Sequence, residues 1–355
     1  MIRKRSFSVL LIVMTICNSA IAQFSPNQED LAITSKEKSE IIDTIITTVN
    51  GSYIFPDIAL QVEKVIRERQ KKGAYNKITS SKEFADTISN QLVQISNDKH
   101  LRILFSYDTV PQRTEKEPPL PDFIETFAIE HNYGFDKIDI LEGNIGYLNI
   151  LGFFPFDEAT NKAIASLGFL SNTQALIIDL RKNTGGVGTL ANFVLSYFYD
   201  QRPFHFLDVM YRKENRVEQS WSSFYVPGKR FIDKPVYVLT SKGTFSAGEA
   251  FAYILQSSKR ATIIGEVTGG GANVGDLIRI NEHFVMNLPV GRPVSPITNS
   301  NWEGTGIKPD IDVAQENALT TAHAAALKEL IQISKDEKVK GQLKAILIRV
   351  QATVK

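Results

Sequence analysis

Cysteine is almost absent from this chain of 355 residues, which contains only Cys17. Cys17 lies within residues 1–22, where basic residues precede an apolar stretch that ends in a small-x-small sequence before Gln23. This pattern is typical of a cleavable secretory signal peptide. We therefore expect an exported protein, periplasmic or extracellular. A mature chain without cysteine has no disulfide, no thiol nucleophile and no cysteine-ligated metal.

The chain also lacks a long apolar run and an excess of charge of one sign. No stretch approaches the roughly 20 apolar residues that cross a bilayer, so we expect no stable membrane span. Lys and Arg number 40 against 39 Asp and Glu, and no basic stripe of the kind that binds nucleic acid is present. The histidines are scattered and no His-Glu-x-x-His or aspartate-rich loop occurs, so neither a metal site nor a cofactor is expected.

The length suggests two domains, and the sequence pattern changes along the chain. Apolar residues recur at helical spacing in three stretches between Ser35 and Ser96, which predicts a small helical bundle within residues 23–108. Prolines and polar residues follow, so residues 109–135 are interpreted as a linker.

Residues 136–355 alternate short β-rich runs with helical patterns. Continuous apolar runs are typical of strands buried on both faces, and they occur at residues 145–150, 175–180, 236–240 and 262–265. Helices are expected between these strands, and two more near the end of the chain, at residues 157–167, 190–198, 247–256, 316–334 and 339–350. Strand-helix-strand units of this kind predict an α/β core.

Ser246 lies where a predicted buried strand meets a predicted helix that begins at Ala247. A serine there is placed to attack a substrate. The amide of Ala247 lies at the helix N-terminus, where free N–H groups and the helix dipole stabilise a developing oxyanion. The alternative is a helix N-cap, a role that serine often fills.

A second turn runs from Asp179 to Gly186 with the sequence Asp-Leu-Arg-Lys-Asn-Thr-Gly-Gly. Gly185 and Gly186 allow the backbone to approach a ligand closely and offer N–H groups to it. Taken alone, the segment is equally an ordinary turn between a strand and a helix.

Four motifs in this order resemble the tail-specific, or carboxyl-terminal processing, serine protease family. They are Asp-Leu-Arg-x-Asn-x-Gly-Gly at 179–186, Thr-x-Ser-Ala-Gly-Glu at 244–249, Ile-Gly-Glu-Val-Thr-Gly-Gly at 264–270 and Trp-Glu-Gly-Thr-Gly-Ile-Lys-Pro-Asp at 302–310. The resemblance implies a crotonase-like or ClpP-like α/β catalytic core and serine peptidase activity. It also implies an oxyanion hole formed by the backbone amides of Gly185 or Gly186 and of Ala247.

The base that activates Ser246 differs from the one usual in the processing proteases. Their lysine lies in a Gly-Lys-Gly turn after the serine, whereas this turn reads Gly-Gly-Gly at residues 269–271, so the usual Ser–Lys dyad is excluded. Histidine is the best alternative base near neutral pH. His100 resembles the histidine of the Asp-x-His element in the interphotoreceptor retinoid-binding protein-like and tricorn-like branch, where it is the base. The alternative is a surface histidine beside Lys99.

Glu303 matches the acidic residue of the tricorn-like branch and is the predicted third member of the triad, which orients the imidazole. In tricorn this acid acts through a serine next to the histidine. Lys99 stands there in this chain, so the resemblance requires a direct contact or another relay. Two carboxylates compete with Glu303 for the role. Asp98 is also interpretable as a local turn residue, and Glu249 as a charge on the first helical turn.

The segment between His100 and the strand at Ile145 is too short for the PDZ module that many processing proteases carry. We therefore expect an exported serine endopeptidase without that module, acting on peptides or unfolded proteins through a Ser-His-Glu triad and an acyl-enzyme. A hydrolase for other esters or amides would use the same triad. The rival hypothesis is a binding protein for an apolar ligand or peptide, favoured by the aromatic segments Phe153–Phe156 and Phe198–Phe206, for which core packing is the simpler explanation.

Overall fold

The computed structural model describes residues 28–112 and 122–352. The predicted signal peptide, residues 1–22, lies outside these ranges. Within them, no helix is both long enough and apolar enough to cross a membrane.

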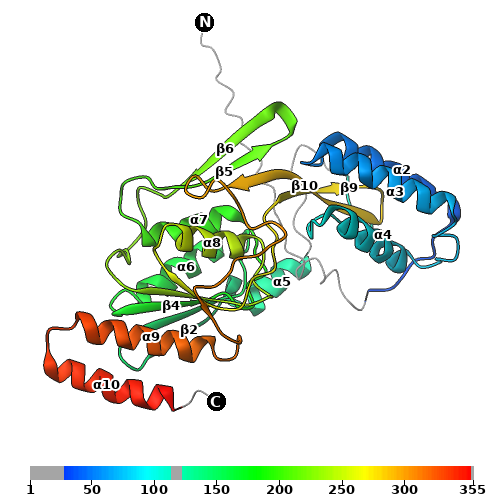
Figure 1. Cartoon of the computed structure of the whole chain (residues 1–355). Helices are drawn as coiled ribbons and strands as arrows, with labels where there is room; N and C mark the ends of the chain where they lie inside the picture. The colour runs from blue at the N-terminus through cyan, green and yellow to red at the C-terminus, as the bar shows by residue number, and fades with distance from the viewer. Residues whose placement is uncertain (1–27, 113–121, 353–355) are drawn as a thin grey trace, which may run out of the picture.

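Three helices form the N-terminal unit, as the sequence predicts (Figure 1). They are α2 (Ser35–Ser52), α3 (Pro56–Lys71) and α4 (Ser81–Ser96). Local signals start each of them: Thr34 and Glu37 form a capping box before α2, a proline opens α3, and the side chain of Ser80 caps α4. Their apolar faces pack together and leave one side open to the strands that follow.

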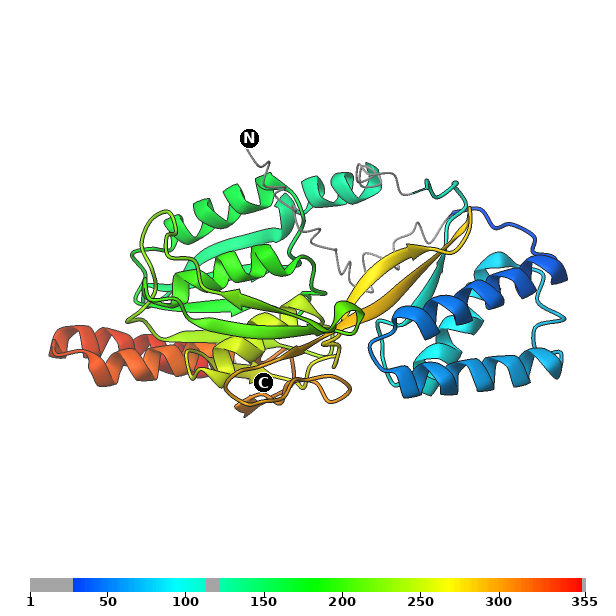
Figure 2. The same cartoon turned by 90° about the horizontal axis from the view of Figure 1, so that it is seen from above.

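A hairpin from the second half of the chain completes the core of this N-terminal unit. Strands β9 (Val274–Arg279) and β10 (Phe284–Val294) pair with each other, and β10 also pairs antiparallel with β1 (Arg102–Phe105). Phe284, Met286 and Leu288 are buried in the same apolar cluster as the three helices. Figure 2 shows this hairpin running from the α/β core to the helices. The two parts of the molecule therefore share one sheet.

The second part of the molecule is built on a six-stranded sheet in the order β11-β8-β7-β4-β3-β2. The strands are β2 (Phe135–Leu141), β3 (Ile145–Ile150), β4 (Ala175–Asp179), β7 (Val236–Thr240), β8 (Thr262–Gly265) and β11 (Ile311–Asp312). All neighbours are parallel except β2 and β3. The four predicted strands and the α/β class are confirmed.

Helices cover both faces of this sheet (Figure 1). One face packs on α6 (Asp157–Phe169), α7 (Gly188–Leu195) and α8 (Ala247–Ser257), and the other on α9 (Ala318–Ile333) and α10 (Glu337–Gln351). Alternate strand residues divide between the two: Leu176 and Ile178 join the first cluster, whereas Ile177 joins the second. Burial on both faces explains the continuous apolar runs.

The remaining elements connect these parts. Strands β5 (His205–Tyr211) and β6 (Arg216–Trp221) extend the first sheet beyond β10, and three short 3₁₀ turns lie at Asn132–Gly134, Ser196–Phe198 and Lys213–Asn215. Helix α5 (Asp122–Glu130) lies within the segment interpreted as a linker. Phe153, Phe198 and Phe206 are buried in the α/β core, which supports packing as the reason for the aromatic segments.

Candidate active site

Ser246 has a backbone conformation that non-glycine residues rarely adopt, with φ 53° and ψ −120°. It lies between β7 and α8, and its residue is 7% exposed. The preceding turn is anchored to the glycine turn: the Thr244 hydroxyl donates to the Leu180 carbonyl at 2.7 Å, and the Phe245 N–H donates to the Asn183 carbonyl at 2.9 Å. Strained backbone persists only where its surroundings hold it, and such residues cluster at functional sites.

The glycine turn after β4 lies against this serine turn. Asn183 holds its shape, because its side chain donates to the Ile150 carbonyl at 3.0 Å and accepts the Gly185 N–H at 2.8 Å. The N–H of Gly185 is therefore occupied. In the described structure neither the N–H of Gly186 nor that of Ala247 donates a hydrogen bond. Of the three amides predicted for an oxyanion hole, these two are free to bind an anion.

Gly186 could not be replaced by a residue with a side chain. Its φ is 124°, and a Cβ there would lie 2.1 Å from the carbonyl oxygen of Phe153. The glycine is needed because the turn pairs closely with the backbone of Phe153.

Glu249 is fully buried and ties Ser246 to the Gly-Gly-Gly turn. One carboxylate oxygen accepts the N–H groups of Ser246 at 3.0 Å and Gly271 at 2.8 Å. The other accepts the Gly270 N–H at 2.7 Å and the Thr268 hydroxyl. Burial raises the pKa of Glu249 to about 7, although these hydrogen bonds act in the opposite direction. Its role is therefore more than that of an exposed charge near a helix dipole.

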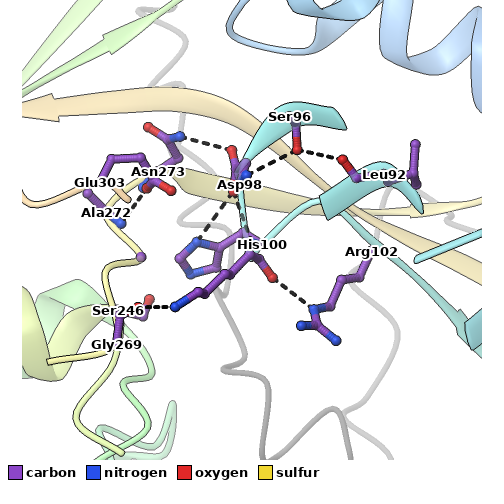
Figure 3. Close-up of polar contacts among 12 residues, drawn as sticks. Leu92, Ser96, Asp98, His100, Arg102, Ser246, Gly269, Ala272, Asn273 and Glu303 are labelled. Atoms are coloured by element: carbon purple, nitrogen blue, oxygen red, sulfur yellow. Dashed lines mark hydrogen bonds and ion pairs between the residues drawn. The ribbon is translucent and has the colours of Figure 1, made fainter. Parts of the chain in front are cut away.

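His100 reaches this site from the N-terminal unit. It is 1% exposed, so the surface alternative is wrong. Its ring packs on that of Phe245, with 4.7 Å between centroids, and a Cβ on Gly271 would lie 2.8 Å from its Cε1 atom. His100 thus touches both the residue before Ser246 and the turn that Glu249 holds beside it. Figure 3 shows its ring near Ser246 and Asp98.

Neither ring nitrogen of His100 has a hydrogen-bond partner in the described structure, so no hydrogen bond joins it to Ser246. Burial lowers the pKa of His100 to about 4, with Asp98 acting in the opposite direction. The imidazole is therefore neutral near pH 7, which is the form that accepts a proton.

Asp98 is buried and connects three parts of the protein. One of its oxygens accepts the His100 backbone N–H at 2.9 Å and lies 4.0 Å from the Nδ1 atom of that ring. The other accepts the hydroxyl of Tyr53 at 3.1 Å and the side-chain amide of Asn273 at 2.9 Å. Asp98 is thus a turn residue that also holds the N-terminal unit and the core together beside the imidazole.

Glu303 lies near both Asp98 and the imidazole of His100, as Figure 3 shows. One oxygen accepts the N–H groups of Ala272 at 2.6 Å and Asn273 at 2.9 Å, whereas the other is buried without a partner. A carboxylate oxygen of Glu303, one of Asp98 and a ring nitrogen of His100 all lie within 4.8 Å of one another. Burial, followed by the charge of Asp98, raises the pKa of Glu303 to about 8.

Lys99 stands where the resemblance to the tricorn-like branch implies a relay serine, and its side chain extends to the Gly-Gly-Gly turn. Its ammonium donates to the carbonyl of Gly269. A lysine therefore reaches the Gly-Gly-Gly turn after all, although from the N-terminal unit. It binds a backbone oxygen there.

Two models of known families match the chain. Residues 144–313 match the model described as peptidase family S41, and residues 28–131 match the N-terminal domain of this peptidase in eukaryotic IRBP. The chain is 32% identical over 179 residues to the carboxy-terminal-processing protease of Bartonella bacilliformis, covering 49% of this chain and 40% of that protein. The chain spans less than half the length of this relative and of two further curated relatives, the carboxyl-terminal-processing proteases of Picosynechococcus and Synechocystis.

Solved structures show the same fold at low sequence identity. A lipoprotein from Streptococcus agalactiae superimposes with a TM-score of 0.56 and 15% identity, over 82% of this chain and 96% of that one. The tricorn protease gives a TM-score of 0.51 and 13% identity, over 89% of this chain and 37% of that one. The ClpP-like fold class is therefore confirmed. Motif order, fold and the two matching models together show that the chain belongs to peptidase family S41.

Proposed function

We propose that this protein is an exported serine-type peptidase that hydrolyses peptide bonds through an acyl-enzyme on Ser246, with His100 as base and Glu303 as the acid of the triad. One observation carries the proposal. The strained Ser246 lies beside two free backbone N–H groups and near a buried, neutral imidazole whose nitrogens have no hydrogen-bond partner in the described structure. The family and the names of its relatives support the same reaction.

In the first step, a ring nitrogen of His100 takes the proton of the Ser246 hydroxyl while Oγ attacks the substrate carbonyl carbon. The two side chains must come within about 3 Å for this, so the substrate complex closes the remaining gap. The carbonyl oxygen becomes an anion and receives the free N–H groups of Gly186 and Ala247. Gly185 contributes by shaping the turn, because Asn183 already occupies its N–H.

The tetrahedral intermediate then collapses, and His100 gives the proton to the leaving amine. Water repeats the cycle on the acyl-enzyme and restores the serine. Each time, His100 becomes a cation in a buried position, which requires a nearby negative charge. Asp98 lies beside the ring and supplies this charge, and the cationic ring in turn favours the ionised form of the neighbouring Glu303, whose pKa is otherwise raised. In this proposal Glu303 acts on the imidazole directly, without a serine relay, because one of its oxygens lies within 4.8 Å of a ring nitrogen.

The substrate we propose is a peptide or an unfolded protein outside the cytoplasm. Export is supported by the signal-like pattern of residues 1–22. The same triad would cleave other esters or amides, so the activity test must separate these substrate classes.

A fluorophosphonate probe tests the nucleophile directly, because it labels only an activated serine. We expect the wild-type protein to be labelled and Ser246→Ala to lose both labelling and cleavage of a peptide library, with a decrease in kcat of about 10⁴-fold or more. Ser257→Ala is the matched control, because Ser257 lies at the far end of the same helix. Absence of labelling of the wild type under all conditions would refute the proposal. Cleavage of an ester but of no peptide would refute the peptidase assignment.

A further inference from the structure

Asp98, His100 and Glu303 form a three-residue cluster with unused binding capacity. Their ligand-type atoms all lie within 4.8 Å of one another. Both ring nitrogens of the fully buried His100 and one oxygen of Glu303 have no hydrogen-bond partner in the described structure. We propose that this cluster binds a Zn²⁺ ion and that the bound ion inhibits the enzyme.

The ligand set suits zinc. One imidazole nitrogen and two carboxylate oxygens are ordinary zinc ligands, and three protein ligands leave a fourth position for water. Tetrahedral zinc places its ligand atoms about 3.4 Å apart, so the cluster must contract by up to about 1.4 Å. Glu303 can supply most of this movement, because its side chain has three rotatable bonds and its free oxygen is the atom without a partner.

A second set of groups already orients the two carboxylates. Tyr53 and Asn273 donate to one oxygen of Asp98, and the backbone amides of Ala272 and Asn273 donate to one oxygen of Glu303. In metal sites, such outer hydrogen bonds fix the direction of the ligands and raise affinity. Here they leave the second oxygen of Glu303 for the ion.

The charge of the cluster also favours a divalent cation. The buried carboxyl group of Asp98 and the partly buried one of Glu303 lie together, and the cationic side chains next to His100 in the sequence are engaged elsewhere. The ammonium of Lys99 binds the carbonyl of Gly269, and Arg102 donates from Nε to the carbonyl of Lys99. Within residues 28–112 and 122–352, no lysine or arginine donates a hydrogen bond to either Asp98 or Glu303. A divalent ion would neutralise both carboxylates.

Inhibition follows from the identity of one ligand, and it rests on the proposed function. Zinc would occupy the lone pair with which His100 must accept the Ser246 proton. The nucleophile would keep its position and lose its base, so removal of the metal by a chelator would restore activity. The binding itself does not depend on catalysis.

The test measures zinc binding in a variant that cannot hydrolyse a substrate. Calorimetric titration of ZnCl₂ into chelator-treated Ser246→Ala protein should show one site, and MgCl₂ should show none, because Mg²⁺ prefers an octahedral set of oxygen ligands. Adding His100→Ala or Glu303→Gln should weaken zinc binding by at least about tenfold. His131→Ala is the matched control, since His131 also lies 3.9 Å from an aspartate, Asp136, but far more exposed.

Unchanged zinc affinity in His100→Ala and Glu303→Gln would overturn the site, as would the loss of binding in the control. Thermal unfolding of each variant identifies any that do not fold. If His100→Ala does not fold, the zinc affinity of Glu303→Gln tests the site, because Glu303 is only partly buried and glutamine has the same shape as glutamate. Zinc binding with the expected residue dependence supports the site even if the wild type cleaves no peptide. Zinc binding without inhibition of an active wild type overturns the regulatory part.

Discussion

The two halves of the proposed catalytic machinery are built in different ways. The core half, with Ser246 and the free amides of Gly186 and Ala247, is held by turns at the ends of neighbouring parallel strands. The other half is brought in by the N-terminal unit and depends on contacts across the molecule. Asp98 carries most of these, through Tyr53 and Asn273. Ser246 and its oxyanion hole can therefore be formed by the core alone, while the base His100 takes its position only when the N-terminal unit packs on the core.

Removal of the base His100 should have the largest effect, because it abolishes the contribution of the N-terminal half to catalysis and leaves the core half in place. In His100→Ala, we expect kcat/KM for a peptide to fall by about 10⁴-fold or more, because a serine hydroxyl without a base is a weak nucleophile. Truncation of this buried ring also leaves a cavity against Phe245, so the melting temperature is measured to confirm that the variant still folds. His131→Ala should keep wild-type kinetics. Retention of more than a tenth of the activity in His100→Ala would show that another group is the base.

The core half should lose stability when Glu249, which holds its turns together, is replaced. Glu249→Ala leaves four buried donors without their acceptor, those of Ser246, Thr268, Gly270 and Gly271. We expect a loss of about 3 kcal/mol or more in the free energy of unfolding, measured by denaturant titration. Glu316→Ala is the control, because Glu316 is exposed. A loss below about 1 kcal/mol would mean that water replaces the carboxylate in this role.

The hydrogen bonds of Asp98 that join the two halves can be weakened by the removal of a single hydroxyl group. Tyr53→Phe removes the hydroxyl that donates to Asp98. A hydrogen bond to a charged group contributes about 1.5 to 3 kcal/mol, so we expect a stability loss in this range and a decrease in kcat. Tyr75→Phe is the matched control: its hydroxyl donates to Gln91 at 2.7 Å within the N-terminal unit. A decrease in kcat of the same size in both variants would contradict a specific role for Tyr53.

The contrast between the halves also explains what the sequence could predict. Strands such as β4 and β7 were predictable because both faces are buried and their apolar runs are continuous. Strand β10 was not, since Pro289, Gly291 and Pro293 lie within it. The strand tolerates them partly because its pairing with β9 shifts register between Pro289 and Gly291.

The candidate site follows the same division. Ser246 and the glycine turns belong to local motifs, so order along the chain predicted them. For His100, its polar neighbour Lys99 suggested exposure, and only the family resemblance predicted otherwise. Its burial comes from Phe245 and Gly271, which are distant in the sequence. Tyr53 and Asn273 carry no motif, because their role arises when Asp98 docks on the core.

The smallest expected effect is a shift in the pH profile, which reports the electrostatics of the N-terminal half. Burial places the pKa of His100 at about 4, below its ordinary value of 6.5, so kcat/KM should begin to fall only as the pH approaches 4. Between pH 6.5 and 4 the unfolded chain binds a proton that the folded chain does not, so this group also lowers stability as the pH falls through that window. Asp98 raises the pKa of His100, so Asp98→Asn should move the acid limb lower, by about one pH unit or less. A wild-type limb near pH 6.5 would show that His100 is solvated in the working enzyme and that the two halves are open when substrate binds.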